Sequence, residues 1–358
     1  MTMASVPRPR WRSASGAVAQ ATVLLLLVLA GTWLVRNLEA NLDDRGIRTG
    51  FEFVERTAGF AIGETAIDYS PADTYGRAIA VGLLNTLKVS ALSILSATLL
   101  GFAVGLARLS PNVLLRGAAR GYVELLRNVP LLVQLLFWYA LLLNALPPVQ
   151  SAWQGLGAVL SNRGLVLPIG GTPLLGRFDY EGGWTLSTEL LTLVLGLSTY
   201  TSAYVGEIVR GGLLSVPLGQ REAATALGLN RGAIVLLIVL PQGLRAMLPP
   251  LTSWYLNTVK NSSLAIAVGY PDLVSVADTI INQTGQAIEG VALIIVVYLA
   301  VNLVLSAAVN AYNARIDRRG AAPGVTTPAP ATPLPRWRDL PRWTRRHLAS
   351  TPANAATW

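Results

Sequence analysis

Side chains that carry out covalent chemistry or bind metals are scarce in this chain. Its 358 residues include no cysteine, one histidine (His347) and two lysines, Lys88 and Lys260. Neither lysine stands in the Gly-x4-Gly-Lys-Ser/Thr pattern that binds nucleotide phosphates, so the chain has no ATP site of that kind. We therefore expect no catalytic residue, no metal site and no cofactor.

One central segment predicts a short helix whose composition fits docking. It reads Glu222-Ala-Ala, three residues, Gly228, nine residues, then Ile238-x-Leu-Pro241. Pro217 suits the start of a helix, where its missing N–H needs no partner, and good helix formers follow it. Gly228 can adopt the left-handed conformation that ends a helix. The two alanines leave a smooth surface that a partner can approach closely; an ordinary turn between membrane helices is the alternative.

The composition is that of a membrane protein. Charged residues make up only 13% of the chain and hydrophobic residues 52%, with a mean hydropathy of +0.49. Soluble domains carry about 25% charged residues. The formal charge of +9 could attract nucleic acid, but the arginines fall between and beside apolar runs. We therefore interpret the charge as a signal of membrane topology and expect no nucleic-acid partner.

Six apolar runs are long enough to cross a bilayer, which takes about 20 residues of helix. They cover residues 18–35, 81–106, 122–146, 186–208, 240–259 and 288–311. An even number of spans places both termini on one side, and the arginines mark that side as cytoplasmic. The sequence therefore predicts an all-α integral membrane protein with about six transmembrane helices.

The runs divide the chain into three parts. Residues 1–80 hold the cytoplasmic N-terminus, the first transmembrane helix and a periplasmic segment. Residues 81–311 form the core, with a periplasmic insertion at 147–185 whose glycines and prolines predict mostly turns. Residues 312–358 form a cytoplasmic tail rich in Pro, Ala and Thr. We expect this tail to be disordered, although its tryptophans and arginines could instead touch anionic lipid.

The fifth run is not expected to form a regular helix. It is interrupted by Pro241, Arg245, Pro249 and Pro250, and irregular backbone at membrane depth must be surrounded by protein or water. We therefore expect the crossing to start near Leu248 and residues 229–245 to lie along the cytoplasmic boundary.

The docking segment resembles the cytoplasmic loop of ABC-importer permease subunits, which is a short helix that docks on a separate ATPase. Other motifs resemble those of polar-amino-acid permeases, and together they cover about residues 81–311. They are Gly82-Leu-Leu-Asn-Thr-Leu-Lys88, Tyr122-Val-Glu-Leu-Leu-Arg-Asn-Val-Pro-Leu-Leu132, Tyr204-Val-Gly-Glu-Ile-Val-Arg-Gly-Gly212, Lys260-Asn-Ser-Ser-Leu264 and Gly269-Tyr-Pro-Asp-Leu273. The long first periplasmic segment, the insertion and Asn282-Gln-Thr-Gly-Gln-Ala-Ile288 resemble the larger membrane subunit of general L-amino-acid importers.

This resemblance implies a type I ABC-importer transmembrane domain in a bacterial inner membrane. The chain would be a non-catalytic permease subunit for L-amino acids, polar or broad in range. Its partners would be two ATP-binding subunits, a periplasmic amino-acid-binding protein, membrane lipid and a second permease subunit. The insertions favour a different chain over an identical one for that second subunit. The loop at 217–241 would couple to the ATPase, and the residues implied for this role are Gln220, Glu222, Ala223, Ala224 and Gly228.

Polar side chains near the middle of the spans are the candidates for the translocation path. A zwitterionic amino acid needs donors for its carboxylate and acceptors for its ammonium. Both are offered by Thr86, Thr201, Ser202, Asn257, Asn261 and Ser262. Hydrogen bonding between helices is the alternative for each of them.

Several charged residues lie within the predicted spans or at their ends. Lys88 lies inside the second run, where a charge indicates function by default. Lys260 could attract a carboxylate or extend to the membrane surface. Glu207 and Arg210 are spaced to pair on one helix face, and Glu124 with Arg127 repeats that spacing.

Two other function classes are alternatives. An ion-driven secondary transporter would need buried acids or histidines for its coupling ion, and the predicted spans hold few. A structural or signalling membrane scaffold could share the same helices, and only the docking segment argues against it.

Overall fold

The computed structural model describes residues 14–44, 49–176 and 180–320. The chain forms two compact units, Met1–Ala307 and Ala308–Trp358, and the elements below belong to the first unit apart from the last turns of α10. Several residues noted in the sequence lie outside the described part. They are the N-terminal arginines that contribute to the topology prediction (Arg8, Arg10 and Arg12), and the tail from residue 321 with its tryptophans (Trp337 and Trp343) and His347.

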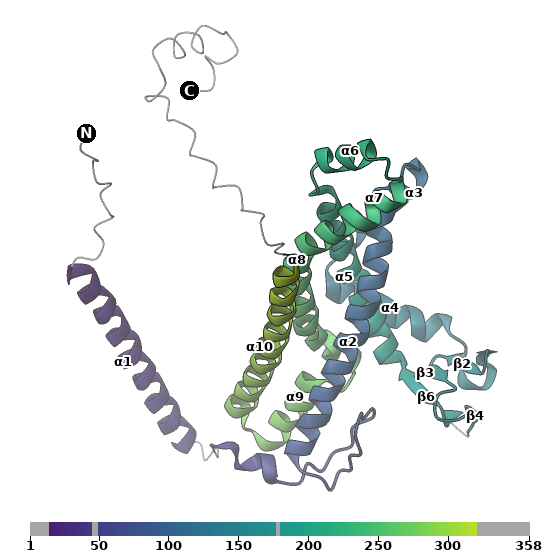
Figure 1. Ribbon diagram of the computed structural model, residues 1–358. Helices are drawn as coiled ribbons and strands as arrows, with labels where there is room; N and C mark the ends of the chain where they lie inside the picture. The colour runs from purple at the N-terminus through teal and green to yellow at the C-terminus, as the bar shows by residue number, and fades with distance from the viewer. Residues whose placement is uncertain (1–13, 45–48, 177–179, 321–358) are drawn as a thin grey trace, which may run out of the picture. The chain divides into compact units, whose positions relative to one another are not determined.

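Helices make up most of the described chain (Figure 1). The α-helices are α1 (Ala14–Asp44), α2 (Tyr75–Arg108), α3 (Val113–Asn128), α4 (Leu131–Ala145), α5 (Thr188–Leu214), α6 (Leu218–Ala226), α7 (Arg231–Ile234), α8 (Leu240–Asn261), α9 (Leu273–Thr284) and α10 (Ala287–Gly320). Shorter 3₁₀ segments are Phe51–Glu55, Val149–Ser151 and Ser262–Val268, and Val235–Val239 is a π-helical turn.

Among the described residues, four helical segments are long and apolar enough to cross a membrane: Val18–Leu38, Tyr75–Arg108, Arg231–Val268 and Ala287–Val309. The bent pair α3 and α4 makes a fifth if it is counted as one span. No residue in the most apolar window of the first and last segments is buried within the chain. Such extended apolar surface is what helices that face lipid expose.

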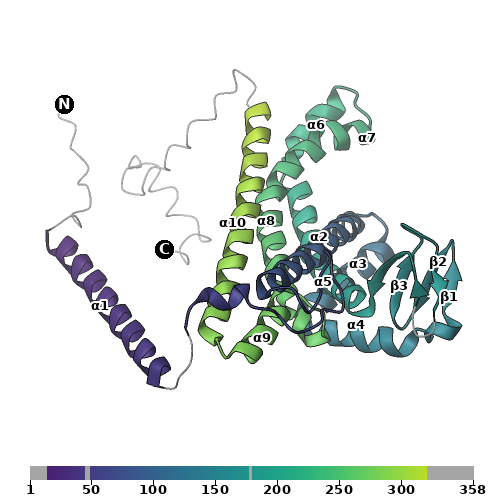
Figure 2. The same ribbon diagram turned by 90° about the horizontal axis from the view of Figure 1, so that it is seen from below.

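The span predicted at 186–208 forms α5, but its composition is too polar to join these four segments. α5 packs against α2, α3, α4 and α8, so it lies among the other helices (Figures 1 and 2). Its hydroxyl side chains are buried there, including those of Thr192, Thr201 and Ser202. A helix surrounded by protein can be polar, because its hydroxyls bond to neighbouring groups and avoid lipid.

The third span differs from the sequence prediction. Residues 122–146 are not one helix: α3 and α4 meet at 106°. Pro130 restricts the preceding residue to extended conformations, and Val129 is extended (φ −95°, ψ 126°), which ends α3 at Asn128. α3 also begins well before Tyr122, at Val113, where the Asn112 side chain accepts hydrogen bonds from the Leu114 and Leu115 amides.

The fifth span also differs from the prediction. The backbone is helical from Arg231 to Val268, and it passes through Pro249 and Pro250 without a break. The π-helical turn ends at Val239, two residues before Pro241, and widens the helix next to the position where that residue lacks an N–H. Beyond Pro249 and Pro250, the Thr252 hydroxyl donates to the Leu248 carbonyl (2.8 Å).

The insertion at 147–185 contains a small antiparallel sheet where the sequence predicted mostly turns. Its strands are β1 (Trp153–Gly155), β2 (Ala158–Ser161), β3 (Gly164–Leu167), β4 (Leu174–Leu175), β5 (Tyr180–Glu181) and β6 (Trp184–Ser187). The order β1-β2-β3-β6 forms one sheet, and β4 and β5 pair separately. Val159 and Val166 are paired across β2 and β3 and are buried. Figure 2 shows this sheet at the end of α5 that β6 leads into.

The centre of the fold is a close contact between α2 and α5. A Cβ added to Gly101 would lie 2.5 Å from the Val205 Cβ, and one added to Gly105 would lie 2.7 Å from the Val209 Cβ. Small residues allow helix backbones to approach closely in membranes, where van der Waals packing drives association. These two glycines therefore set the distance between α2 and α5.

Candidate functional site

The predicted docking segment forms the short helix α6. Gly228 has φ +80°, and the Leu229 and Gly228 amides donate to the carbonyls of Ala224 (3.1 Å) and Thr225 (2.9 Å). This is the hydrogen-bond pattern of a Schellman helix end, which requires a left-handed residue at that position. The prediction that Gly228 ends the helix is confirmed.

One face of α6 is fixed to the helix bundle. Ala224 is buried and packs in a cluster with Val216, Ile234 and Met247. The Arg221 guanidinium donates to the Leu213 carbonyl (2.6 Å) at the end of α5. The Gln220 side-chain oxygen accepts from the Gln242 amide (2.6 Å) at the start of α8. A displacement of α6 is therefore transmitted to both α5 and α8.

The opposite face of α6 is open. Glu222 and Ala223 are exposed, and so are Leu218 (71%) and Leu227 (82%). Leu218, Glu222 and Ala223 lie on sides of the helix away from the buried Ala224 and give it a surface that a protein groove can bind, while Leu227 lies at its end. Neither leucine is among the site residues predicted from the sequence, although both are apolar residues in a short helical segment between membrane spans.

Four of the six candidate path residues are fully buried and hydrogen-bonded among the helices. The Thr201 hydroxyl bonds to that of Thr258 (3.1 Å), and the Ser202 hydroxyl to that of Tyr122 (2.7 Å). Thr86 accepts from the Leu273 amide (3.0 Å), and Ser262 donates to the Val259 carbonyl (2.7 Å). Each of these groups therefore has a partner within the protein.

Asn257 and Asn261 differ from these four because they are only partly buried. They lie one turn apart on α8, and Trp254 precedes them on the same helix by one turn. The Trp254 ring stacks on Tyr204 of α5, with ring centroids 3.7 Å apart. Tyr200 packs edge-on against Tyr204 (5.1 Å between centroids). The sequence alone does not reveal this stack, because its members come from two helices.

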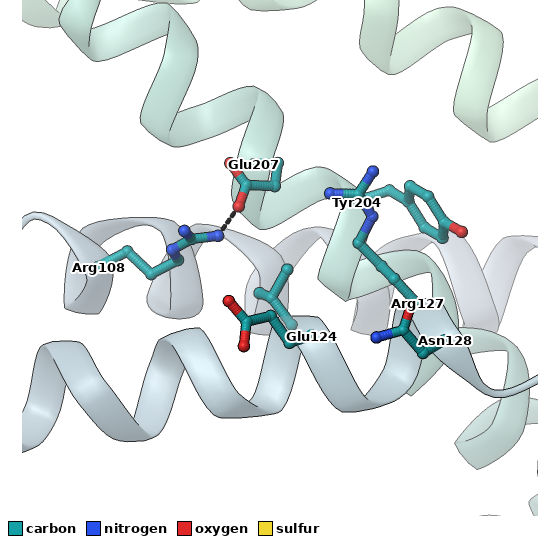
Figure 3. Close-up of a pocket in the computed structure, with 7 residues that line it drawn as sticks. Arg108, Glu124, Arg127, Asn128, Tyr204 and Glu207 are labelled. Atoms are coloured by element: carbon teal, nitrogen blue, oxygen red, sulfur yellow. Dashed lines mark ion pairs between the residues drawn. The ribbon is translucent and has the colours of Figure 1, made fainter.

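A second group of polar residues forms a pocket where α2, α3 and α5 meet; we call it the inner pocket (Figure 3). Its lining residues are Arg108, Val123, Glu124, Arg127, Asn128, Tyr204 and Glu207. The Glu207 carboxylate pairs with Arg108 of α2 and with Arg210 (3.0 Å). The predicted Glu207–Arg210 pair is therefore confirmed, whereas Arg108 was not anticipated.

Glu124 and Arg127 do not pair with each other, although they repeat that spacing. Glu124 accepts from Arg120 (2.7 Å) one turn earlier on α3. The Arg127 guanidinium instead lies over the Tyr204 ring, 4.9 Å from its centroid, as Figure 3 shows. This geometry is a cation–π contact.

The outer cluster, defined as Glu64, Lys88, Ser187 and Tyr270, joins distant segments through one carboxylate. Glu64 pairs with Lys88 of α2 and accepts hydrogen bonds from the hydroxyls of Ser187 (2.6 Å) and Tyr270 (3.4 Å). The Lys88 ammonium also lies 5.6 Å from the centre of the Trp184 ring. Glu64, in the first long segment, thus connects α2, the end of the insertion and the loop before α9. Lys260, in contrast, is exposed.

Asp272, in the loop before α9, is fully buried. One of its oxygens accepts from the Ser275 amide (2.9 Å) and caps α9. Burial raises the pKa of Asp272 to about 7, because desolvation disfavours the charged form. Among the described residues, no three His, Asp or Glu side chains gather in a way that could hold a metal ion.

Comparison with known proteins yields one family. Residues 97–318 match the model of the family described as binding-protein-dependent transport system inner membrane component. The putative amino-acid ABC transporter permease protein YhdX of Escherichia coli (strain K12) is 42% identical, with 82% of this chain and 92% of the relative covered. The general L-amino acid transport system permease protein AapQ of Rhizobium johnstonii is 38% identical, with 82% and 90% covered. A solved structure described as a crystal structure of an amino acid ABC transporter with histidines matches at a TM-score of 0.53 and 26% identity, covering 67% of this chain and 95% of that one.

Proposed function

We propose that this chain is a membrane subunit of an ATP-driven importer of L-amino acids. The premise is its family, because the chain belongs to the binding-protein-dependent transport system inner membrane components. Its fold is that of a type I ABC-importer transmembrane domain. The names of its relatives support amino acids as the substrate class, and the general L-amino-acid permease supports a broad range.

The complex would contain this chain, a second permease subunit of different sequence, two ATP-binding subunits and a periplasmic binding protein. ATP hydrolysis is assigned to separate subunits, because this sequence lacks the Gly-x4-Gly-Lys-Ser/Thr phosphate loop. The chain itself supplies the path through the bacterial inner membrane and performs no covalent step.

The observation that carries this proposal is the geometry of α6. Its exposed face, with Leu218, Glu222 and Ala223, presents a docking surface. Its other face is tied to α5 through Arg221 and to α8 through Gln220. ATP-driven closure of two ATPase subunits would push α6 and thereby rock α5 and α8 between outward-facing and inward-facing states.

The substrate path would run beside α5 and α8. Asn257 and Asn261 are the two candidate residues with partly exposed amides, which can serve both the ammonium and the carboxylate of an amino acid. The aromatic stack of Tyr204 and Trp254 lies next to them and offers a face to the ammonium. Thr86, Thr201, Ser202 and Ser262 would hold the helices that frame this path.

The test is ATP-dependent uptake by the purified complex, captured through a tag on this chain. An ATPase should copurify, and proteoliposomes loaded with ATP should accumulate a labelled mixture of L-amino acids when the binding protein is outside. Glu222→Lys should reduce uptake to background, because it reverses the charge on the face of α6 that would dock on the ATPase. Glu55→Lys, which reverses another exposed acid far from α6 in the sequence, is the matched control.

Two outcomes would contradict the proposal. Uptake driven by an ion gradient without ATP would favour a secondary transporter. A chain that purifies without an ATPase and supports no uptake would favour a membrane scaffold.

A further inference from the structure

The less buried face of the insertion's sheet is also its more apolar face. Residues paired across antiparallel strands share a face, and neighbours along a strand lie on opposite faces. Along β2 and β3 the buried residues, among them Val159 and Val166, belong to one face, and the half-buried residues belong to the other. We call this second face the leucine face. It comprises Trp153, Gly155, Ala158, Leu160, Leu165, Leu167, Trp184 and Leu186.

The composition of the leucine face does not suit water. An antiparallel sheet with one side in water carries polar residues on that side, whereas none of these eight residues has a charged, hydroxyl or amide side chain. Trp153 is 59% exposed and Trp184 is 38% exposed. The turn between β1 and β2 extends the apolar surface, because Leu156 is fully exposed there, at a φ of +53° that leucine rarely adopts. Exposed apolar surface of this kind marks contact with a membrane or with another protein.

Leu186 sets the direction of the leucine face. Its side chain packs against the core cluster to which α4 and α5 contribute. The pairing register places Leu186, Leu165, Leu160 and Trp153 in one row across β6, β3, β2 and β1. β6 and β3 contact α5, and β1 and β2 lie farther out (Figure 2). The row therefore begins at the apolar core of the helix bundle and continues outward from it on the same side of the sheet.

Lipid suits the leucine face better than a protein partner does. Only residues 146–148 separate the end of α4 from the first turn of the insertion, and β6 leads directly into α5, so the sheet stays close to the membrane helices. A protein interface forms about one hydrogen bond per 100–200 Å², and on this face only the two indole N–H groups could contribute from side chains. Within the part of the chain that the structure describes, neither indole N–H has a hydrogen-bond partner. Tryptophans are enriched where a bilayer meets water, because the ring is apolar and the N–H reaches a polar group.

We propose that the leucine face rests in the membrane surface beside the bundle, which is the periplasmic surface in the predicted topology. Acyl chains cover the leucines, and lipid headgroup oxygens accept hydrogen bonds from Trp153 and Trp184. The Ser187 hydroxyl, at the end of β6, accepts from the Leu190 amide (3.1 Å) and caps α5. A sheet held by lipid therefore fixes the first turn of α5 relative to the bilayer. This binding goes beyond the proposed function and does not depend on what the chain transports.

The experiment uses the complex captured through the tag on this chain, in liposomes of phosphatidylethanolamine and phosphatidylglycerol. A spin label is attached to one introduced cysteine, since the native chain has none, and the signal of the complex with the unmodified chain is subtracted. Trp153→Cys and Leu160→Cys place the label on the leucine face, and Leu160→Cys keeps both tryptophans. Collisions of the label are measured with oxygen, which concentrates in lipid, and with a water-soluble nickel chelate. At both positions the ratio of oxygen to nickel collisions should be several-fold higher than at the control positions.

Gln154→Cys and Thr185→Cys are the matched controls, because both residues are exposed and lie on the opposite face of β1 and β6. Their labels should collide mainly with nickel. Predominant collision with nickel at positions 153 and 160 would place the leucine face in water and overturn the inference. Few collisions with either reagent would mean that a protein subunit covers the face, which overturns it equally. The measurement needs no transport, so a complex that imports nothing would contradict the proposed function without deciding this result.

Discussion

At the scale of single residues, two ion pairs fasten α2 to other segments. Lys88 pairs with Glu64 in the outer cluster, and Arg108 pairs with Glu207 in the inner pocket. The Lys88 and Glu64 side chains are only 21% and 17% exposed. Removing one partner of such a shielded pair is costly, because the remaining charge is neither paired nor fully hydrated.

Lys88→Met should therefore destabilise the protein by about 2 kcal/mol, a typical value for losing a hydrogen bond to a charged group. The measurement is the midpoint of thermal unfolding in detergent. Adding Glu64→Gln to Lys88→Met should raise the midpoint again, because no unpaired carboxylate remains while the Ser187 hydroxyl keeps an acceptor. If the two changes lower the midpoint additively, the residues are not coupled.

Sequence reasoning at this scale succeeds where partners are neighbours in the chain. Gly228 was identified as a helix end and Glu207–Arg210 as a pair, since both depend on spacings within one helix. Glu64 and Arg108 were missed as partners because their contacts join segments far apart in the sequence. No local pattern records such a contact.

At the scale of elements, the contact between α2 and α5 depends on a glycine. A side chain at Gly101 would meet the Val205 Cβ at 2.5 Å and the Ser202 carbonyl at 3.1 Å. Gly101→Val should therefore force the helices apart and cost about 1–3 kcal/mol, as overpacking of a core does. The expected signs are a lower unfolding midpoint and faster cleavage by trypsin.

Gly117→Val on α3 is the control for that change, because an added Cβ there meets no atom within 4 Å. Both positions are helical, so the two variants share the same change in helix propensity. Equal loss of stability in the two variants would show that backbone effects, rather than the α2–α5 contact, determine the result.

The elements also show which features were hidden in the sequence. Apolar runs at 18–35, 81–106 and 288–311 fall within α1, α2 and α10, because length and hydropathy suffice to identify a lipid-facing helix. The same criteria treat residues 122–146 as one run and do not register the bend at Val129. The strands at 153–187 are two to four residues long, too short for a visible alternation, and their hydrogen bonds come from partners that sequence does not specify.

At the scale of the whole molecule, the orientation across the membrane follows from the arginines. The segments that carry α6, the end of α2 together with α3, and the end of α10 are rich in arginine, which predicts that they are cytoplasmic. Residues 37–80 and 147–185 would then be periplasmic, and both termini cytoplasmic. Residues 37–80 and 147–185 can share a side only if the bent pair α3 and α4 counts as one crossing, in addition to α2.

The absence of native cysteine makes this arrangement testable with single introduced cysteines. Cysteines replacing Ser70 and Thr172, which are exposed in the two long segments, should react with a membrane-impermeant maleimide in intact cells. A cysteine replacing Ser215, exposed just before α6, should react only after lysis, and the unmodified chain serves as the blank. Reaction of positions 70 and 172 on opposite sides would mean that α3 and α4 do not form one crossing. Reaction of position 215 in intact cells would invert the orientation and remove α6 from the reach of a cytoplasmic ATPase, because a helix on the outer side has no access to ATP-binding subunits.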